Sequence, residues 1–281
     1  MPTLDDYIDK AQHLVPAPVI LSKLPPLLSH PNTDSSQIVE LISYDQSLTG
    51  NVLRVCNSAY FSPATPIDNL QYAVVRIGFR LIYDIVVSVI FSSTLRCGTE
   101  GEGVEANALW EHSVATAVAA QLIARDLLAD EQVVFTAAIL HDIGKIVLAP
   151  ALTGLRYEVA HESITNGLTP LEIEMKLLGT DHAQVGGRLL ERWQLPEDLV
   201  AAVRHHHKPS AAEGHQQLTA CVNLGDFIAY SIGHGYGQHS FDLNERDESL
   251  EILSLSTEHV SQYTNEVVET LQHVKSLYQI Q

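Results

Sequence analysis

A histidine and an aspartate stand side by side, as His141 and Asp142, inside an apolar run that otherwise has the composition of a buried helix. Burying an unpaired carboxylate beside an imidazole costs on the order of several kcal/mol. The pair must therefore be neutralised by a cation, a salt bridge or a metal ion. Any fold open to this chain has to bring such a partner into its interior.

The apolar composition predicts an all-α protein. Hydrophobic residues make up 46% of the 281 residues and aromatic residues only 6%, with Ala, Leu, Val and Ile dominant. Such a composition suits the packing of helices better than a sandwich of aromatic-rich strands. The chain is long enough for one large domain or two ordinary ones.

The charge of the chain restricts its partners. Sixteen Lys and Arg residues against 34 Asp and Glu residues give a formal net charge of -18. This excess discourages non-specific binding to nucleic acids or anionic membranes, and we expect neither partner. The N-terminus shows no basic region followed by a long apolar core, and no run of about 18 uncharged apolar residues occurs. We therefore expect a cytoplasmic protein.

A glycine-rich, acidic segment without periodicity begins at Cys97 and is the best candidate for a linker. We place an N-terminal helical unit at residues 1–96, the linker at 97–107, and a helical bundle with a C-terminal helix at 108–281. The residues with metal-binding chemistry fall in the third of these segments.

Further imidazole and carboxylate groups accompany the His141–Asp142 pair on apolar stretches. They are His112, His182, the run His205-His206-His207, and Asp226. Nitrogen and oxygen ligands of this kind suit zinc, iron, manganese or nickel. Other interpretations stay open: His112 as a hydrogen-bonded core histidine, His182 as a helix cap, and Lys145 as an ordinary surface cation.

The segment from Leu140 to Lys145 resembles the signature of the HD superfamily of metal-dependent phosphohydrolases. The order of motifs from Val15 to Ala229 resembles the HDOD branch of that superfamily. The resemblance rests on the pattern around Leu24-Pro25 and on residues 45–49, 52–61, 73–78, 110–113, 182–196, 206–209 and 223–229. The stretch Asn57-Ser58-Ala59-Tyr60-Phe61 is the most specific of these in the first half.

The resemblance implies a dinuclear metal site with Asp142 as the bridging ligand. His112, His141 and Asp226 would complete one set of ligands, and His182, His206 and His207 the other. Iron is the first expectation for the two ions, with manganese, zinc or nickel as alternatives. Adjacent helical residues point about 100° apart, so His141 and Asp142 can share a centre only if it lies between them.

The same resemblance implies catalytic roles. A hydroxide held between two metals is a nucleophile near neutral pH, and the ions offset charge on a phosphoryl oxygen. Asp142 would organise that centre, and Lys145 would hold the phosphate. The implied partners are a phosphate-ester or nucleotide ligand and a signalling protein, and the oligomeric state stays open.

Two departures from related patterns narrow the expected activity. Relatives that cleave cyclic dinucleotides carry Gly-Tyr-Pro shortly after the paired histidines, whereas His207 is followed here by Lys208-Pro209-Ser210. We therefore do not expect a cyclic-di-GMP phosphodiesterase. Ala108 stands where some relatives place an additional glutamate ligand, and Glu111 lies on the wrong helical face to replace it, so no third metal is expected.

Two functions follow from these patterns. The first is metal-dependent hydrolysis of a phosphate ester or nucleotide in a signalling protein. The second is a non-catalytic regulatory module with a structural or vestigial metal, which works by binding a protein partner. The register of the triple histidine also stays open, with either His205 or His207 as the member that does not bind.

Overall fold

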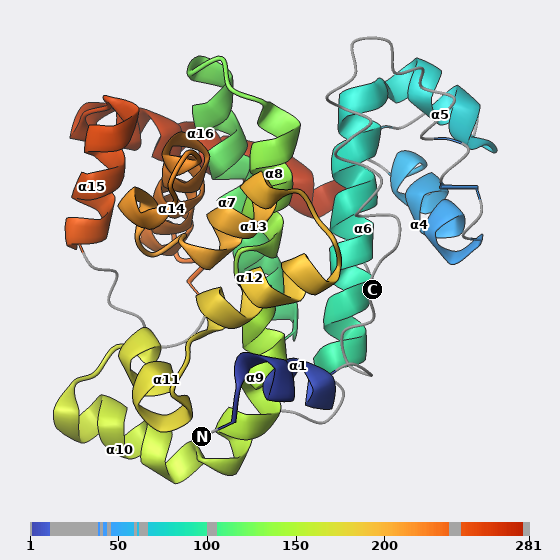
Figure 1. Cartoon of the computed structure of the whole chain (residues 1–281). Coiled ribbons are helices and arrows are strands. Elements are labelled where there is room, and N and C mark those ends of the chain that lie inside the picture. Colours follow the sequence, from blue (N-terminus) through green and yellow to red (C-terminus); the bar gives the residue numbers. More distant parts are fainter. Residues whose placement is uncertain are drawn as a thin grey trace.

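Helices make up every regular element in the part of the chain that the computed structural model describes, which confirms the all-α prediction (Figure 1). The described residues are 2–11, 39, 42–43, 46–58, 61, 67–99, 106–235 and 243–277. Leu24-Pro25, Asp45, Ala59, Tyr60 and residues 100–105 of the predicted linker lie outside them.

The order of the helices follows the chain from an N-terminal group to a larger bundle. The first group comprises α1 (Leu4–Ala11), α4 (Gln46–Cys56), α5 (Leu70–Ile77) and α6 (Phe79–Thr99). The bundle comprises α7 (Ala106–Asp126), α8 (Glu131–Leu140), α9 (Ile143–Gly154), α10 (Arg156–Asn166), α11 (Pro170–Leu178), α12 (His182–Arg192), α13 (Glu197–Arg204), η1 (Pro209–Ala211), α14 (Gln216–Ser231), α15 (Leu243–Leu253) and α16 (Thr257–Leu277).

The centre of the bundle is the contact between α7 and α14, where two helix backbones come unusually close. A Cβ atom at Gly225 would lie 2.8 Å from the carbonyl oxygen of Thr116 and 2.9 Å from the Cβ of Ala120. Only glycine avoids that overlap without displacing a helix. The close approach sets Asp226, the next residue on α14, beside His112 on α7.

Helix α6 joins the N-terminal helices to the bundle. It packs against α4 and α5 on one side and against α7, α8 and α9 on the other (Figure 1). The hydroxyl of Tyr83 on α6 hydrogen-bonds to that of Thr136 on α8, at 2.7 Å, inside a hydrophobic core that runs through both groups. Because α6 continues to Thr99, the first residues of the predicted linker are helical.

Helix α1 packs against α9 and α12 of the bundle, although it comes first in the chain. The hydroxyl of Tyr7 donates to the carbonyl of Leu178 at 3.2 Å, and Arg188 on α12 donates to Asp5 at 2.9 and 3.0 Å. Figure 1 shows α1 beside α9 and α12, away from α4 and α5. The N-terminal residues are therefore part of the surroundings of α12.

The motif residue Asn57 has a structural role. Its side-chain amide donates to the carbonyls of Leu53 and Ile67 at 2.8 and 2.7 Å, and its side-chain oxygen accepts from the backbone N–H of Ile67 at 2.8 Å. These bonds tie the end of α4 to the chain ten residues later. Asn57 therefore organises a helix terminus.

Among the described residues, the stretch Glu131–Gly154 has the length and apolar composition of a membrane span. It comprises α8, the turn at His141–Asp142 and α9, and 83% of its apolar window is buried within the protein. Such burial is typical of core helices in a soluble protein, so the stretch is weak evidence for a membrane segment.

A buried carboxylate between α6 and α7 gives the first testable prediction. Burial raises the pKa of Asp84 to about 7, although a hydrogen bond from Gln121 at 3.1 Å opposes the shift. Because this pKa lies above the unfolded value of 3.8, the folded protein loses stability as the pH rises from about 4 to about 7.

We expect Asp84→Asn to unfold at a higher temperature than the wild type at pH 8 and at nearly the same temperature at pH 4. Each unit of pKa difference corresponds to about 1.4 kcal/mol. Thermal unfolding at the two pH values measures the effect, with the exposed Asp68→Asn as a control. Equal shifts at both pH values would contradict the assignment.

Candidate metal centre

His141 and Asp142 lie at a break between two helices. The apolar run around them, which has the composition of a single buried helix, is divided: α8 ends at Leu140 and α9 begins at Ile143. Asp142 has φ -96° and ψ 10°, outside the helical region, and its side chain makes no capping hydrogen bond. The break, rather than helical spacing, lets both side chains face one centre.

Asp142 lies between two groups of histidines. Its Oδ2 atom lies 3.4 Å from Nε2 of both His112 and His141. Its Oδ1 atom lies 3.3 Å from Nε2 of His182 and 3.9 Å from Nε2 of His206. One carboxylate thus presents a different oxygen to each group.

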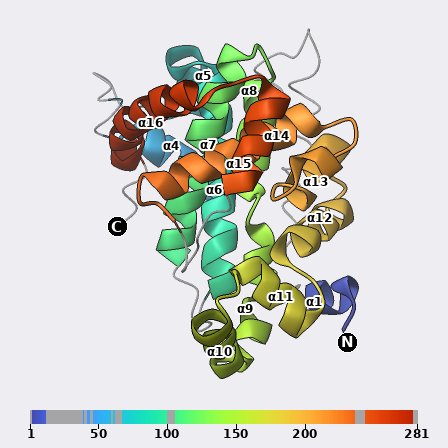
Figure 2. The same ribbon diagram turned by 90° about the vertical axis from the view of Figure 1, so that its left-hand side faces the viewer.

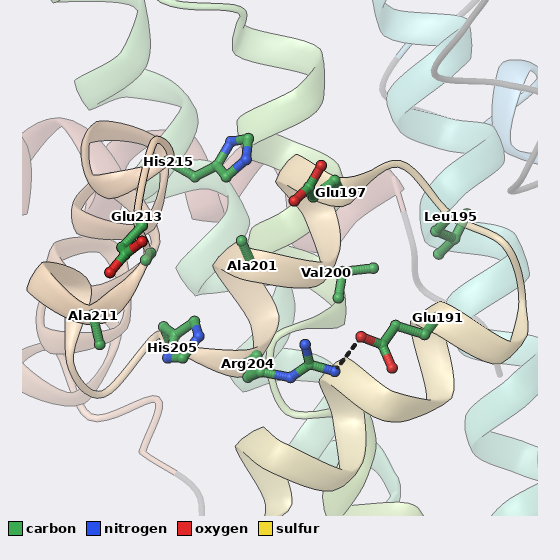
Figure 3. A pocket seen from close by; sticks show the side chains of 11 residues that line it. Glu191, Leu195, Glu197, Val200, Ala201, Arg204, His205, Ala211, Glu213 and His215 are labelled. Carbon is green, nitrogen blue, oxygen red and sulfur yellow. Dashed lines mark ion pairs between the residues drawn. The ribbon is translucent and has the colours of Figure 1, made fainter.

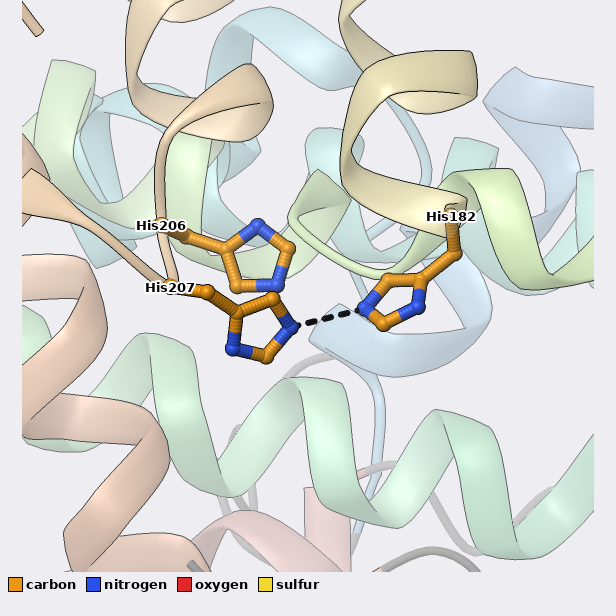
Figure 4. A group of neighbouring side chains, drawn as sticks. All are labelled: His182, His206 and His207. Atoms are coloured by element: carbon orange, nitrogen blue, oxygen red, sulfur yellow. Dashed lines mark hydrogen bonds between the residues drawn. The ribbon is translucent and has the colours of Figure 1, made fainter. Parts of the chain in front are cut away.

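Each group gathers three candidate ligand atoms within 4.8 Å of one another. We call the first group the aspartate half; it consists of His112, His141 and Asp226. We call the second group the histidine half; it consists of His182, His206 and His207 (Figure 4). The structure therefore brings together all seven residues named from the sequence. Lys145 joins them, with its Nζ 2.6 Å from Oδ2 of Asp142.

The outward nitrogens of the rings determine which nitrogen faces the centre. The Nδ1 atoms of His112, His141 and His206 lie 2.8, 2.6 and 2.7 Å from the carbonyl oxygens of His234, Ala138 and Val203. A carbonyl only accepts, so each Nδ1 carries a proton, and in the neutral ring the lone pair of Nε2 points inward.

The inward lone pairs require a cation. Nε2 of His112 and Nε2 of His141 lie only 3.2 Å apart, and neither neutral ring has a proton to place between them. Nε2 of His206 is buried without a hydrogen-bonding partner among the described residues. A proton or a metal ion between these atoms removes the conflict, so the donor set fits a metal ion.

The carboxylates of the cluster are held in the charged form. Burial alone would raise their pKa values, but nearby imidazoles outweigh it: His112 chiefly lowers the pKa of Asp226 to about 2, and His141 and Lys145 hold that of Asp142 well below its usual range. Burial lowers the pKa of His112, yet Asp142 and Asp226 raise it to about 9. A proton on His112 therefore balances the anions, and a metal ion binding there would displace it.

Glu174 is a site residue that the sequence reasoning missed. Its Oε2 atom accepts from the backbone N–H of His182 at 2.8 Å and lies 2.7 Å from Nδ1 of the same residue. The carboxylate is buried on α11, although a glutamate in a short amphipathic helix has the pattern of a solvated side chain. The sequence signal for a buried Glu174 was its position directly after the apolar Ile173, which the structure shows to be buried.

His205 faces away from the cluster. It lines a cavity of about 540 Å³ on the outer side of α13, together with Arg204, which pairs with Glu191 at 2.8 Å (Figure 3). A second cavity, of about 420 Å³, lies near Asp198 and Gln216. Neither cavity is lined by a residue of the cluster. The register of the triple histidine therefore places His206 and His207, not His205, at the centre.

Comparison with known proteins agrees with the motifs and the fold. The HDOD domain family matches residues 14–209. An uncharacterized protein of Treponema pallidum (strain Nichols) is 26% identical over 226 residues, which are 78% of this chain and 42% of that protein. The chain thus spans less than half the length of this curated relative.

Two solved structures share the fold along nearly their whole length. An HDOD domain protein of unknown function from Geobacter sulfurreducens has a TM-score of 0.80 at 23% identity, covering 99% of this chain and 97% of that one. A proposed phosphohydrolase from Shewanella amazonensis SB2B has a TM-score of 0.69 at 19% identity, covering 96% of each. The family match extends over more than half of the chain, and this protein belongs to the HDOD family.

Proposed function

We propose that this protein binds two metal ions at the cluster and uses them to hydrolyse a phosphate ester or nucleotide. The observation that carries the proposal is the division of the two Asp142 oxygens between two groups of histidines. One ion would be held by His112, His141 and Asp226. The other ion would be held by His182, His206 and His207, and Asp142 would bind both ions. Iron is our first expectation, with manganese, zinc or nickel as alternatives.

The residues at the edge of the cluster suggest where a phosphate would approach. His207 and Lys145 are partly exposed, whereas the other six site residues are buried. When bound, two divalent ions supply Lewis acidity and activate a water molecule near neutral pH. Lys145 is mostly buried, which lowers the pKa of its ammonium, but Asp142 raises that pKa above its usual value. The charged ammonium would bind a phosphoryl oxygen on this side.

The alternative function is regulatory, with a metal that serves the structure. The burial of six of the seven candidate ligands favours it, because a catalytic ion needs an open position for its substrate. In that case the protein would act in signalling by binding a protein partner. Cyclic-di-GMP hydrolysis is not expected in either case.

The test separates metal binding from catalysis. We expect protein purified without chelator to contain about two ions per chain, and the Mn²⁺-loaded protein to hydrolyse p-nitrophenyl phosphate or a nucleotide. Lys145→Gln should keep the ions and lose most of the activity, whereas Lys176→Gln, a surface change on α11, should alter neither. Two ions without hydrolysis of any ester would support the regulatory function.

A further inference from the structure

We infer that the two halves of the cluster hold their ions unequally: the aspartate half retains its ion, and the histidine half exchanges its ion with solution. The inference rests on the proposed dinuclear site. It adds that this protein responds to the free concentration of a divalent cation through the second ion.

The first difference between the halves is charge. Asp142, and the Lys145 ammonium beside it, are common to both halves. Asp226 belongs to the aspartate half alone, with its Oδ1 atom 3.1 Å from Nε2 of His112. The histidine half offers three imidazoles and no carboxylate among its own candidate ligand atoms, because the carboxylate of Glu174 lies behind the ring of His182. A buried cation is therefore stabilised more strongly in the aspartate half.

The second difference is access to solvent. His112 and His141 are fully buried, and Asp226 is 3% exposed. His207 is partly exposed, and it lies in the turn after α13 rather than on a helix (Figure 4). The histidine half therefore reaches solvent through one of its own candidate ligands. The aspartate half has no partly exposed ligand.

The third difference is the support behind the ligands. In the aspartate half the rings of His112 and His141 are oriented by main-chain carbonyls. In the histidine half the carbonyl of Val203 orients His206 in the same way, but the ring of His182 is oriented by a side chain, the carboxylate of Glu174. Glu174 comes from the α10–α11 hairpin, which Figures 1 and 2 show at the end of the molecule far from α5.

These contacts make Glu174 a positioning residue for the exchangeable ion. Its Oε2 atom receives both the N–H of His182 and the Nδ1 proton of the ring, so it determines the orientation of Nε2. Helix α11 also contacts α1, through the hydrogen bond from Tyr7 to Leu178.

The experiment is a stepwise removal of Mn²⁺ from the loaded full-length protein. We would dialyse it against graded chelator, measure manganese per chain, and follow the loss of coupling between the two ions by electron paramagnetic resonance. We expect two separate steps, of which the step at lower chelator concentration is the loss of the ion of the histidine half. Glu174→Gln should weaken only the second ion, by about 10–100-fold.

Two further variants keep the test informative if one of them folds poorly. His207→Ala changes a partly exposed side chain and should abolish only the weaker step. Glu162→Gln alters a carboxylate that pairs with Lys176 on α11 but does not touch His182, and it should change neither step.

The outcomes distinguish this inference from the function on which it rests. If both ions are lost in a single step, or if Glu174→Gln weakens both ions equally, the inference of unequal binding is wrong, but the proposed dinuclear site is not contradicted. A wild-type protein that binds no Mn²⁺, Fe²⁺ or Zn²⁺ overturns both proposals.

Discussion

Asp142→Asn is expected to abolish the binding of both metal ions, leaving a folded protein with almost no metal by elemental analysis. The reason is that Oδ2 of Asp142 faces His112 and His141 while Oδ1 faces His182 and His206. An amide keeps the shape of the side chain but removes its charge and one acceptor. We expect a loss of affinity larger than the about 10–100-fold caused by removing a residue behind a ligand.

The same variant changes stability through Lys145. The ammonium lies 2.6 Å from Oδ2, and its side chain is only 11% exposed. Removing one partner of a buried ion pair lowers the stability of the folded protein by about 3–5 kcal/mol. The double variant Asp142→Asn, Lys145→Met should recover stability without recovering metal, which separates ligand loss from unfolding.

Asp198→Asn is the matched control, because its carboxylate lies on α13 outside the cluster. It should bind the same amount of metal as the wild type. Retention of one ion by Asp142→Asn would show that the carboxylate serves one half of the cluster alone, and the bridging role would then be wrong.

Much of the candidate site could be predicted because its residues interrupt apolar stretches. His112 and Asp226 are polar side chains in largely buried stretches of α7 and α14, and His182 is buried at the start of the amphipathic α12; such positions need a partner. The break between α8 and α9 was not predicted, because Ala, Ile and Leu occur on both sides of His141–Asp142, and Asp142 and Gly144 alone are weak signals of a helix boundary.

Contacts between distant segments were also invisible in the sequence. Glu174 and Asp5 are acidic residues on amphipathic helices, a pattern that indicates solvent exposure, yet each meets a partner from another helix. Local periodicity determines the face of a helix that is buried. It does not determine which carboxylate on the edge of that face meets a histidine or an arginine.

Glycines of the bundle decide how closely the helices that carry the ligands approach one another, and Gly144 is the clearest case. A Cβ atom there would overlap the carbonyl oxygen of His182 and lie 2.8 Å from the backbone nitrogen of Gly186. Both are main-chain atoms, so no change of rotamer relieves the contact. Helices α9 and α12 would have to separate at the point where Asp142 and His182 meet.

We therefore expect Gly144→Ala to lower the free energy of unfolding by about 3 kcal/mol, at the upper end of the usual cost of overpacking. The midpoint of thermal unfolding should fall by roughly 2–4 °C for each kcal/mol. Metal analysis of the folded fraction should show loss of the ion of the histidine half, because the displaced His182 supplies one of its ligands.

Gly154→Ala is the matched control on the same helix, since a Cβ atom at Gly154 would have no neighbour within 4 Å. Alanine is the better helix former by up to about 1 kcal/mol, so this variant should be as stable as the wild type or slightly more stable. If both alanine variants behaved alike, the close contact between α9 and α12 would not be what aligns Asp142 with His182. A loss confined to Gly144→Ala would show that the absence of one side chain allows the two halves of the cluster to meet.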